Sequence, residues 1–255
     1  MRLTEGQLTD FARDGFLVLP ELFSVAEIEA IDARLPALFA ERCPANFRER
    51  SSDVVRTAMG LHLRDALFSN LVRDARFVEA AAQLTGEDDL YVQQVKVNAK
   101  EAFTGEQWQW HYDFATHHHE DGVPEPLALN LHIFLDEVTE FNGPLVFIPG
   151  SHRDGPVPTA LDTVSTSYPL WTVGNDVVRP LAERGGLVAA KGLPGTVLIF
   201  GDTMIHGSSA NMSPWARRIF SLILNPVGNH QTTMRRPDHQ HHRDFAPVRM
   251  LQSVL

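Results

Sequence analysis

The chain has 255 residues, of which 44% are apolar, enough to form a sizeable core in one domain. It carries 22 basic and 32 acidic residues, and this formal net charge of -10 argues against nucleic acids and anionic membranes as partners. Cys43 is the only cysteine, which excludes an internal disulfide and a cysteine-rich zinc site. The first residues lack the apolar core of a secretory signal, and no apolar run approaches the ~20 residues of a membrane helix. We therefore expect a cytoplasmic protein.

Helices dominate the predicted N-terminal part. Thr4 and Ser24 are each followed three residues later by Gln or Glu, which is the capping-box spacing that predicts a helix start. A short strand and turn are expected between these two helices. A third helix is predicted over residues 65–86, ending at Gly86.

The pattern changes after Leu90, where short apolar or alternating runs are separated by Gly, Pro and Asn. Such runs are typical of an antiparallel sandwich or barrel. The segment 153–190 is polar and irregular, and we expect a long loop or lid there. We predict a single domain, residues 1–255, in three parts: a mostly helical part at 1–89, a β core at 90–230 and a C-terminal tail at 231–255.

A His-x-Asp tripeptide can supply two ligands to a metal, and a distant histidine can supply the third. This 2-His-1-carboxylate set suits ferrous iron and leaves coordination positions open. The tripeptide occurs four times, as His111/Asp113, His119/Asp121, His152/Asp154 and His242/Asp244. His111 follows the strand-like "WQW", so a rigid element can orient its ring. His119 is expected in an exposed loop, His152 follows a Pro-Gly turn, and no strand follows His242.

His206 is the best candidate for the third ligand, because it ends the apolar strand in "GDTMIHGSS". Arg217 lies eleven residues further on. A ferrous dioxygenase of this type uses 2-oxoglutarate, and the far carboxylate of that molecule needs a planar, bidentate cation, which arginine supplies. In "RRIFSLIL" both faces are apolar, so the residues leave open whether Arg217 or Arg218 points inward.

Other polar residues have simpler interpretations. Arg56 could bind a substrate carboxylate, or it could form a surface or structural salt bridge. Trp108 and Trp110 alternate with glutamines in a strand, so core packing is expected. The "HQHH" run at 239–242 is expected to be an exposed tail. Several acidic residues are expected on solvated faces and at turn caps: Glu120, Asp121, Glu125, Asp136 and Glu137.

The combined motifs carry a family resemblance. "LTEGQLTDFARDGFLVLPELFS", "QVKVNAK", "WHYDF" with "EDGVP", "TEFNGPLVFIPGSH" and "HGSSANMSPWARR" make the chain resemble the phytanoyl-CoA dioxygenase-like superfamily of Fe(II)/2-oxoglutarate enzymes. The likeness is strongest to ectoine hydroxylases and to hydroxylases of free amino acids such as proline and leucine. It implies a mainly β fold with flanking helices, built on a double-stranded β-helix, a cupin-like jelly roll.

The resemblance also implies roles for single residues. The iron ligands would be His111, Asp113 and His206. Arg217 would grip 2-oxoglutarate, supported by Ser208 and Asn98, and the resemblance thereby selects Arg217 over Arg218. Gln94 and Thr116 would line the substrate pocket. His117 stands where ectoine hydroxylases carry a tryptophan, which favours a free amino acid or a related small zwitterion as substrate.

The implied activity is hydroxylation of an unactivated C–H bond with Fe(II), 2-oxoglutarate and O2, with ascorbate as an optional reductant, by a monomer or homodimer. Related halogenases replace the carboxylate ligand by Gly or Ala, so Asp113 predicts hydroxylation. Three alternatives remain: a dioxygenase acting on a carrier- or CoA-bound acyl group or another natural-product intermediate, a zinc hydrolase with the same ligands, and a non-catalytic jelly-roll binding protein. A zinc hydrolase would need a general base beside its water. No HExxH-type signature exists in the sequence.

Overall fold

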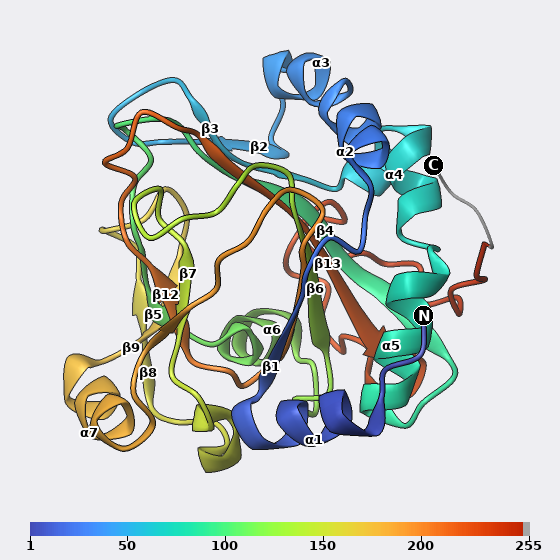
Figure 1. The fold of residues 1–255 in the computed structure, drawn as a ribbon, viewed down its shortest axis with the longest axis vertical. Coiled ribbons are helices and arrows are strands. Elements are labelled where there is room, and N and C mark those ends of the chain that lie inside the picture. Colours follow the sequence, from blue (N-terminus) through green and yellow to red (C-terminus); the bar gives the residue numbers. More distant parts are fainter. Residues whose placement is uncertain (252–255) are drawn as a thin grey trace.

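The computed structural model describes residues 1–251, in which two antiparallel sheets face each other (Figure 1). One helix, α6, lies between the sheets, and the other helices pack outside them. The larger sheet has seven strands, in the order β1 (Phe16–Leu19), β11 (Val197–Gly201), β6 (Leu129–Phe134), β13 (Arg217–Pro226), β4 (Leu90–Lys100), β3 (Val55–Met59) and β2 (Asn46–Arg48). The smaller sheet has four, in the order β10 (Val188–Ala189), β7 (Leu145–Phe147), β12 (His206–Ser208) and β5 (Trp108–His111). A separate hairpin pairs β8 (Thr159–Asp162) with β9 (Leu170–Val173). This arrangement agrees with the mainly β jelly roll expected from the sequence.

The N-terminal helices begin where their capping residues predict. The side chains of Thr4 and Ser24 each form a complete capping box. The predicted third helix is two helices, because the Asp74 side chain accepts a hydrogen bond from the Arg76 backbone N–H at 2.8 Å and starts a new one. The helices are α1 (Glu5–Asp14), α2 (Val25–Asp32), α3 (Leu35–Ala40), α4 (Ala66–Leu71), α5 (Ala75–Thr85), α6 (Asp113–Asp121) and α7 (Asn175–Gly185), with short 3-10 turns at Leu61–Leu63, Ser151–Asp154 and Val227–Asn229.

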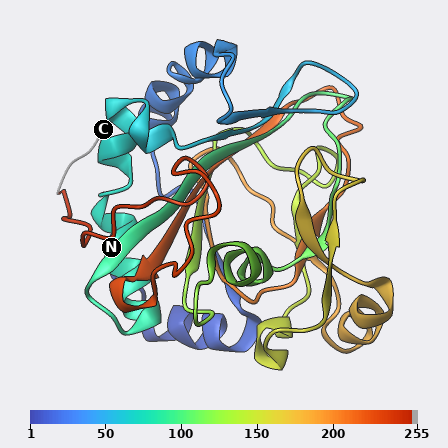
Figure 2. The same ribbon diagram turned by 180° about the vertical axis from the view of Figure 1, so that it is seen from behind.

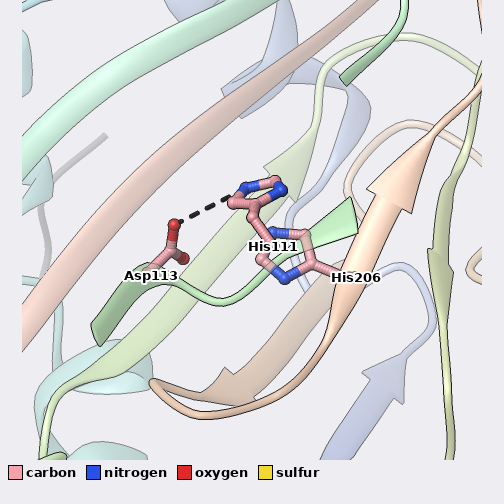
Figure 3. A group of neighbouring side chains, drawn as sticks. All are labelled: His111, Asp113 and His206. Carbon is pink, nitrogen blue, oxygen red and sulfur yellow. Dashed lines mark ion pairs between the residues drawn. The ribbon is translucent and has the colours of Figure 1, made fainter. Parts of the chain in front are cut away.

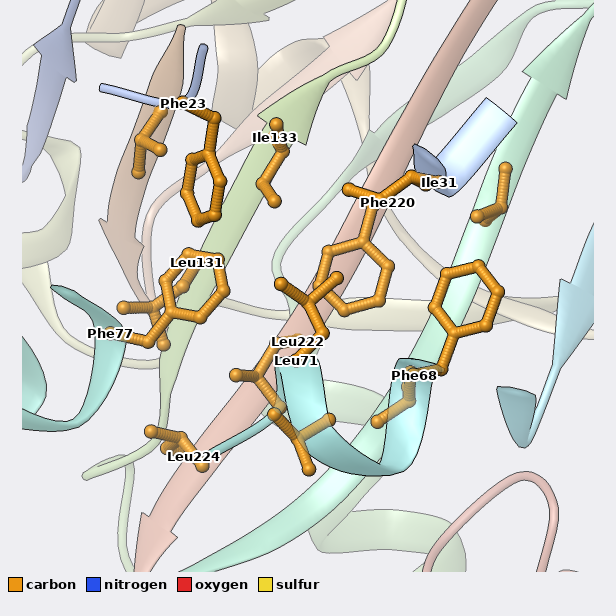
Figure 4. Close-up of a cluster of buried hydrophobic side chains, with 14 of the residues drawn as sticks. Phe23, Ile31, Phe68, Leu71, Phe77, Leu131, Ile133, Phe220, Leu222 and Leu224 are labelled. Atoms are coloured by element: carbon orange, nitrogen blue, oxygen red, sulfur yellow. The ribbon is translucent and has the colours of Figure 1, made fainter. Parts of the chain in front are cut away.

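The main hydrophobic core lies between the outer face of the larger sheet and helices α4 and α5 (Figure 4). The ring of Phe220 on β13 lies 5.8 Å from the ring of Phe68 and 6.4 Å from that of Phe77. Alternate strand residues point to opposite faces, so Arg217, Ile219 and Ser221 of the same strand face the other sheet. One strand therefore anchors the helices and lines the space between the sheets.

The segment 153–190 differs from the long irregular loop expected from the sequence. It contains the β8–β9 hairpin and helix α7. Residues of β9 contact β5 and α6, so tertiary contacts stabilise a hairpin whose own sequence gives a weak strand signal. Strands β2 and β3 were also absent from the prediction and extend the larger sheet at one edge. None of the helices within residues 1–251 is both long and apolar enough to cross a membrane.

Candidate active site

Three side chains with metal-binding atoms meet between the two sheets. His111 ends β5 and is the register partner of His206, which begins β12, while Asp113 is the first residue of α6 (Figure 3). One ligand atom from each of the three lies within 4.8 Å of the others. His111 Nε2 is 3.8 Å from an oxygen of Asp113, and the two imidazole centroids are 4.2 Å apart. The pairing of two short strands thus brings together residues 95 positions apart in the sequence.

The backbone fixes the orientation of both imidazoles. Nδ1 of His111 lies 2.6 Å from the carbonyl oxygen of Gln109, and Nδ1 of His206 lies 2.9 Å from that of Met204. Since a carbonyl can only accept, each Nδ1 carries the proton and each Nε2 keeps its lone pair for a metal. Burial lowers the pKa of His111 to about 3 and also lowers the pKa of His206, which keeps both rings in the neutral form that binds metal.

Asp113 completes a donor set of two neutral imidazoles and one carboxylate. Burial alone raises the pKa of Asp113, but the nearby His206, Lys96 and His111 outweigh burial and lower the pKa below its usual value. The carboxylate is therefore ionised near neutral pH. Two oriented imidazoles and one carboxylate with a cavity beside them fit ferrous iron, which takes this facial set of ligands.

Arg217 provides a buried positive charge in the same cavity. Its side chain is 1% exposed, and its Nε and Nη2 donate to the carbonyl oxygen of Gly143 at 3.1 and 2.9 Å. Nη2 also lies 3.2 Å from Ser208 Oγ, which itself donates to Gly143 at 2.9 Å. Within residues 1–251 no carboxylate forms an ion pair with Arg217. Burial lowers the pKa of this guanidinium to about 9. An anionic ligand would supply the negative charge that no described carboxylate provides.

Gly143 makes this arrangement possible. Its φ is +76°, a conformation that side-chain-bearing residues rarely adopt, and a Cβ there would lie 2.6 Å from the backbone oxygen of Ser209. The glycine carbonyl can thus approach both Arg217 and Ser208. Arg218, the neighbour that the sequence could not exclude, points to the outer face, where it pairs with Asp136 and Asp32.

A cavity of about 240 Å³ joins the metal-binding group to Arg217. Among the residues expected from the sequence, Gln94, Asn98, Thr116, His117 and Ser208 all line it. Such a small, partly polar space between sheets is typical of a site for small molecules.

Arg56 lies behind this cavity and is not among the residues that line it. It is fully buried, donates to Glu49 at 2.9 Å and to the carbonyl oxygen of Gln107 at 2.6 Å, and its guanidinium lies 4.0 Å from the ring centroid of Trp108. Trp108 does line the cavity. The structure therefore places Arg56 in a structural ion pair that supports Trp108. Of the two interpretations open from the sequence, this agrees with the salt bridge and not with binding of a substrate carboxylate.

The C-terminal tail was expected to be exposed, and this expectation is wrong for His241, which is fully buried. Its Nδ1 lies 2.8 Å from a carboxylate oxygen of Asp121, and Arg236 forms a bidentate ion pair with the same carboxylate. Asp121 is therefore not a solvated residue of the helix end but a buried anchor. The anchored tail, which lies over β4 and β13 beside α6 in Figure 2, brings Arg236 and Gln240 into the cavity wall.

Further cavity residues escaped prediction from the sequence. Lys96 and His132 lie at interior positions of central strands, and Tyr168 and Trp171 belong to the hairpin. The Trp171 indole donates to Glu120 at 3.0 Å, and His119, expected in a loop, lies exposed on α6 with its ring stacked on Trp171. The alternation of residues along β4 and β6 could have predicted that Lys96 and His132 face the interior. No local sequence pattern indicates that the tail or the hairpin lines the cavity.

Known proteins are similar to this chain over most of its length. Ectoine dioxygenase of Bordetella bronchiseptica is 35% identical over 99% of this chain and 87% of its own length. L-proline trans-4-hydroxylase of Streptomyces griseoviridis is 37% identical over 93% of this chain and 92% of its own. The crystal structure of EctD from S. alaskensis with 2-oxoglutarate and 5-hydroxyectoine superposes with a TM-score of 0.87 at 31% identity, covering 99% of this chain and 89% of that one.

The family model for phytanoyl-CoA dioxygenase (PhyH) matches residues 11–219, which include the metal-binding group and Arg217. This match spans most of the chain, and it agrees with the resemblance expected from the sequence motifs. The protein belongs to the phytanoyl-CoA dioxygenase (PhyH) family.

Proposed function

We propose that the protein is an Fe(II)- and 2-oxoglutarate-dependent dioxygenase that hydroxylates an unactivated C–H bond of a small zwitterion, a free L-amino acid or an ectoine-like compound. One observation carries the proposal. A buried 2-His-1-carboxylate group and a buried arginine without a carboxylate partner among the described residues line one cavity. A zinc hydrolase would give no role to the arginine, and a binding protein would give none to the metal-binding group.

His111, Asp113 and His206 would hold the iron, whose chemistry with 2-oxoglutarate is the activation of O2. Arg217 would bind the far carboxylate of 2-oxoglutarate through its guanidinium, with the Ser208 hydroxyl beside it. Asn98 accepts a hydrogen bond from Thr57 at 2.9 Å, which orients its amide so that Nδ2 remains as a donor for a ligand.

Charged residues on the cavity wall support a zwitterionic substrate. Lys96 and Arg236 supply positive charges for a carboxylate, and Glu120 supplies a negative charge for an ammonium group. Gln94 and Thr116 add neutral hydrogen-bonding groups on the same wall. Curated relatives at 35–37% identity are named for ectoine and proline, which are small molecules of this class.

The β8–β9 hairpin would exclude water from the reaction. Leu161, Tyr168, Leu170 and Trp171 of this segment line the cavity, so the hairpin forms one of its walls. The Trp171 indole donates a hydrogen bond to Glu120. The closure of the hairpin over the cavity would therefore be coupled to the orientation of the charged substrate group by Glu120.

The test is the anaerobic addition of Fe(II) and 2-oxoglutarate, followed by a substrate screen. A visible charge-transfer band should form, and free amino acids or ectoine should yield succinate together with a product heavier by one oxygen atom. Turnover of CoA- or carrier-bound acyl groups alone would overturn the assignment of the substrate class. Absence of the band would overturn the assignment of the protein as a dioxygenase. A cytoplasmic location and a monomeric or homodimeric state remain predictions for cell fractionation and light scattering.

A further inference from the structure

A β-bulge in the smaller sheet turns Trp108 toward the metal-binding group. His206 pairs with His111 and Ser208 pairs with Trp108, so β5 has one residue more than β12 between the two pairs. Two residues three positions apart on a regular strand point to opposite faces of the sheet. Because the bulge adds a residue, Trp108 and His111 instead line the same cavity. Bulges beside active sites re-aim side chains in this way.

The other tryptophan of β5, Trp110, is not among the described residues that line the cavity. It packs against a separate apolar cluster that includes Ile205, and a Cβ on Gly207 would lie 3.3 Å from its ring. Of the remaining tryptophans, Trp171 lines the cavity from the β8–β9 hairpin, and Trp215 is 61% exposed on a surface loop. The same ring type thus occurs both inside and outside the cavity.

Three neighbours hold the indole of Trp108 in place. The Arg56 guanidinium lies 4.0 Å from the centroid of the indole, and the ring centroid of Tyr168 lies 5.4 Å from it. The ring centroid of His111 lies 6.4 Å away. Arg56 is itself fixed by a buried ion pair with Glu49. Among the phenylalanine, tyrosine and tryptophan side chains of the described cavity wall, only Trp108 has its ring against a metal-binding histidine.

The position of this ring matters when no substrate is bound. The proposed dioxygenase reaction removes two electrons from 2-oxoglutarate and two from a substrate C–H bond for each O2 that it reduces. If O2 and 2-oxoglutarate react in the absence of a substrate, the second pair of electrons must come from another group. An indole ring is electron-rich and readily oxidised, and a group fixed beside the reacting centre gains greatly in rate from its position.

We infer that the protein hydroxylates its own Trp108 when it consumes O2 and 2-oxoglutarate without a substrate. One atom of O2 is inserted into an indole C–H bond, whose hydrogen remains on the new hydroxyl group. The other atom enters the carboxylate of succinate as 2-oxoglutarate loses CO2. The indole and 2-oxoglutarate each lose two electrons, which together reduce O2. The inference rests on the proposed dioxygenase function and adds to it a modification site on the protein itself.

Peptide mass spectrometry tests the inference without a known substrate. The protein is loaded anaerobically with Fe(II) and 2-oxoglutarate. O2 enriched in the heavy oxygen isotope is then admitted in the presence of catalase, which removes diffusible peroxide, and fragment spectra locate any added oxygen. The adduct at Trp108 should carry the isotope and exceed that at Trp110 and Trp215 by ~10-fold or more, because proximity to the reacting centre raises the rate. Omission of 2-oxoglutarate should abolish it.

Two matched variants follow the same measurement. Trp108→Phe should remove the oxygen adduct at position 108, because a phenyl ring is harder to oxidise than an indole. Trp110→Phe makes the same change two residues along the strand and outside the cavity, and it should leave the adduct at Trp108 as in the parent. The charge-transfer band shows that each variant is folded and loaded before O2 is admitted.

The outcomes separate the two proposals. Without a charge-transfer band, the dioxygenase function itself fails. If the band forms and Trp108 stays unmodified after O2 is admitted, the inference alone is overturned. Modification of Trp215 to the same extent as Trp108 would indicate a diffusible oxidant and also overturns it. The same holds if the oxygen appears on Tyr168 or Trp171 instead, or if the adduct at Trp108 persists without 2-oxoglutarate.

Discussion

Arg236 and Asp121 meet in a buried bidentate ion pair that ties the C-terminal tail to the end of α6 and brings the arginine into the cavity wall. His241 shares the same carboxylate at 2.8 Å. Burial raises the pKa of Asp121, but Arg236 and His241 outweigh it, so the pKa lies below its usual value and the carboxylate stays ionised. One aspartate therefore anchors two tail residues that lie five positions apart in the sequence.

Replacing Asp121 by Ala should affect both stability and substrate binding. Removing one partner of a buried ion pair costs about 3–5 kcal/mol of unfolding free energy, because the guanidinium stays buried without compensation. The KM for the substrate should rise more than kcat falls, since Arg236 loses its anchor. Chemical denaturation and steady-state kinetics measure the two effects. Asp238→Ala, which removes a more exposed tail carboxylate, should cost about 1 kcal/mol or less; equal effects of both variants would contradict this role.

Replacing Asp113 by Gly should abolish hydroxylation. The change leaves two imidazoles without the carboxylate that completes the donor set, and iron binding should weaken. Coupled succinate formation and metal content after dialysis are the measurements. Asp244→Gly is the matched control, because it alters another His-x-Asp tripeptide in the tail. Full hydroxylation by Asp113→Gly would show that the metal ligands have been misassigned.

Replacing Arg217 by Gln should weaken binding of 2-oxoglutarate. Hydrogen bonds to a charged group contribute about 1.5–3 kcal/mol, so the dissociation constant should rise ~10- to 100-fold. Titration of the charge-transfer band gives this constant directly. Arg218→Gln should leave it unchanged and lower stability instead, because Arg218 bonds Asp136 and Asp32 on the outer face. A similar loss of 2-oxoglutarate affinity in both variants would speak against the assignment.

The stability of the protein should fall in mild acid because of His62. Burial, together with the neighbouring His242 and against an opposing effect of Asp238, lowers the pKa of this ring to about 3. The unfolded ring takes up its proton near pH 6.5, whereas the folded ring resists it down to about pH 3. The stabilisation is therefore complete above pH 6.5 and is lost as the pH falls, with a slope of about 1.4 kcal/mol per pH unit for one proton.

The variant His62→Leu should remove this share of the pH dependence. Urea denaturation at several pH values between 4 and 7 measures the slope in each protein. His230→Leu, which replaces an exposed histidine, should leave the slope as in the parent. An unchanged slope in His62→Leu would show that His62 does not cause the acid sensitivity.

Local chemistry in the sequence was sufficient for several elements. The helix starts at Thr4 and Ser24 follow from capping spacing, a signal that lies within one helical turn. The strand ahead of His111 and the strand at Arg217 were visible as alternating or apolar runs. Motif and spacing also selected His111, Asp113 and His206 as candidate metal ligands, and the structure brings the three side chains together.

Only the tertiary structure decided the partners of buried polar groups. Arg217 and Arg218 are adjacent in an apolar strand, so their side chains point to opposite faces of the larger sheet. Arg217 points into the cavity, whereas Arg218 points to the outer face and contacts Asp136. Asp121 and His241 looked like solvated residues, yet contacts across 120 positions bury both. A pattern of residues fixes local conformation through short-range hydrogen bonds and periodicity, whereas the burial of a polar group depends on which distant segment packs against it.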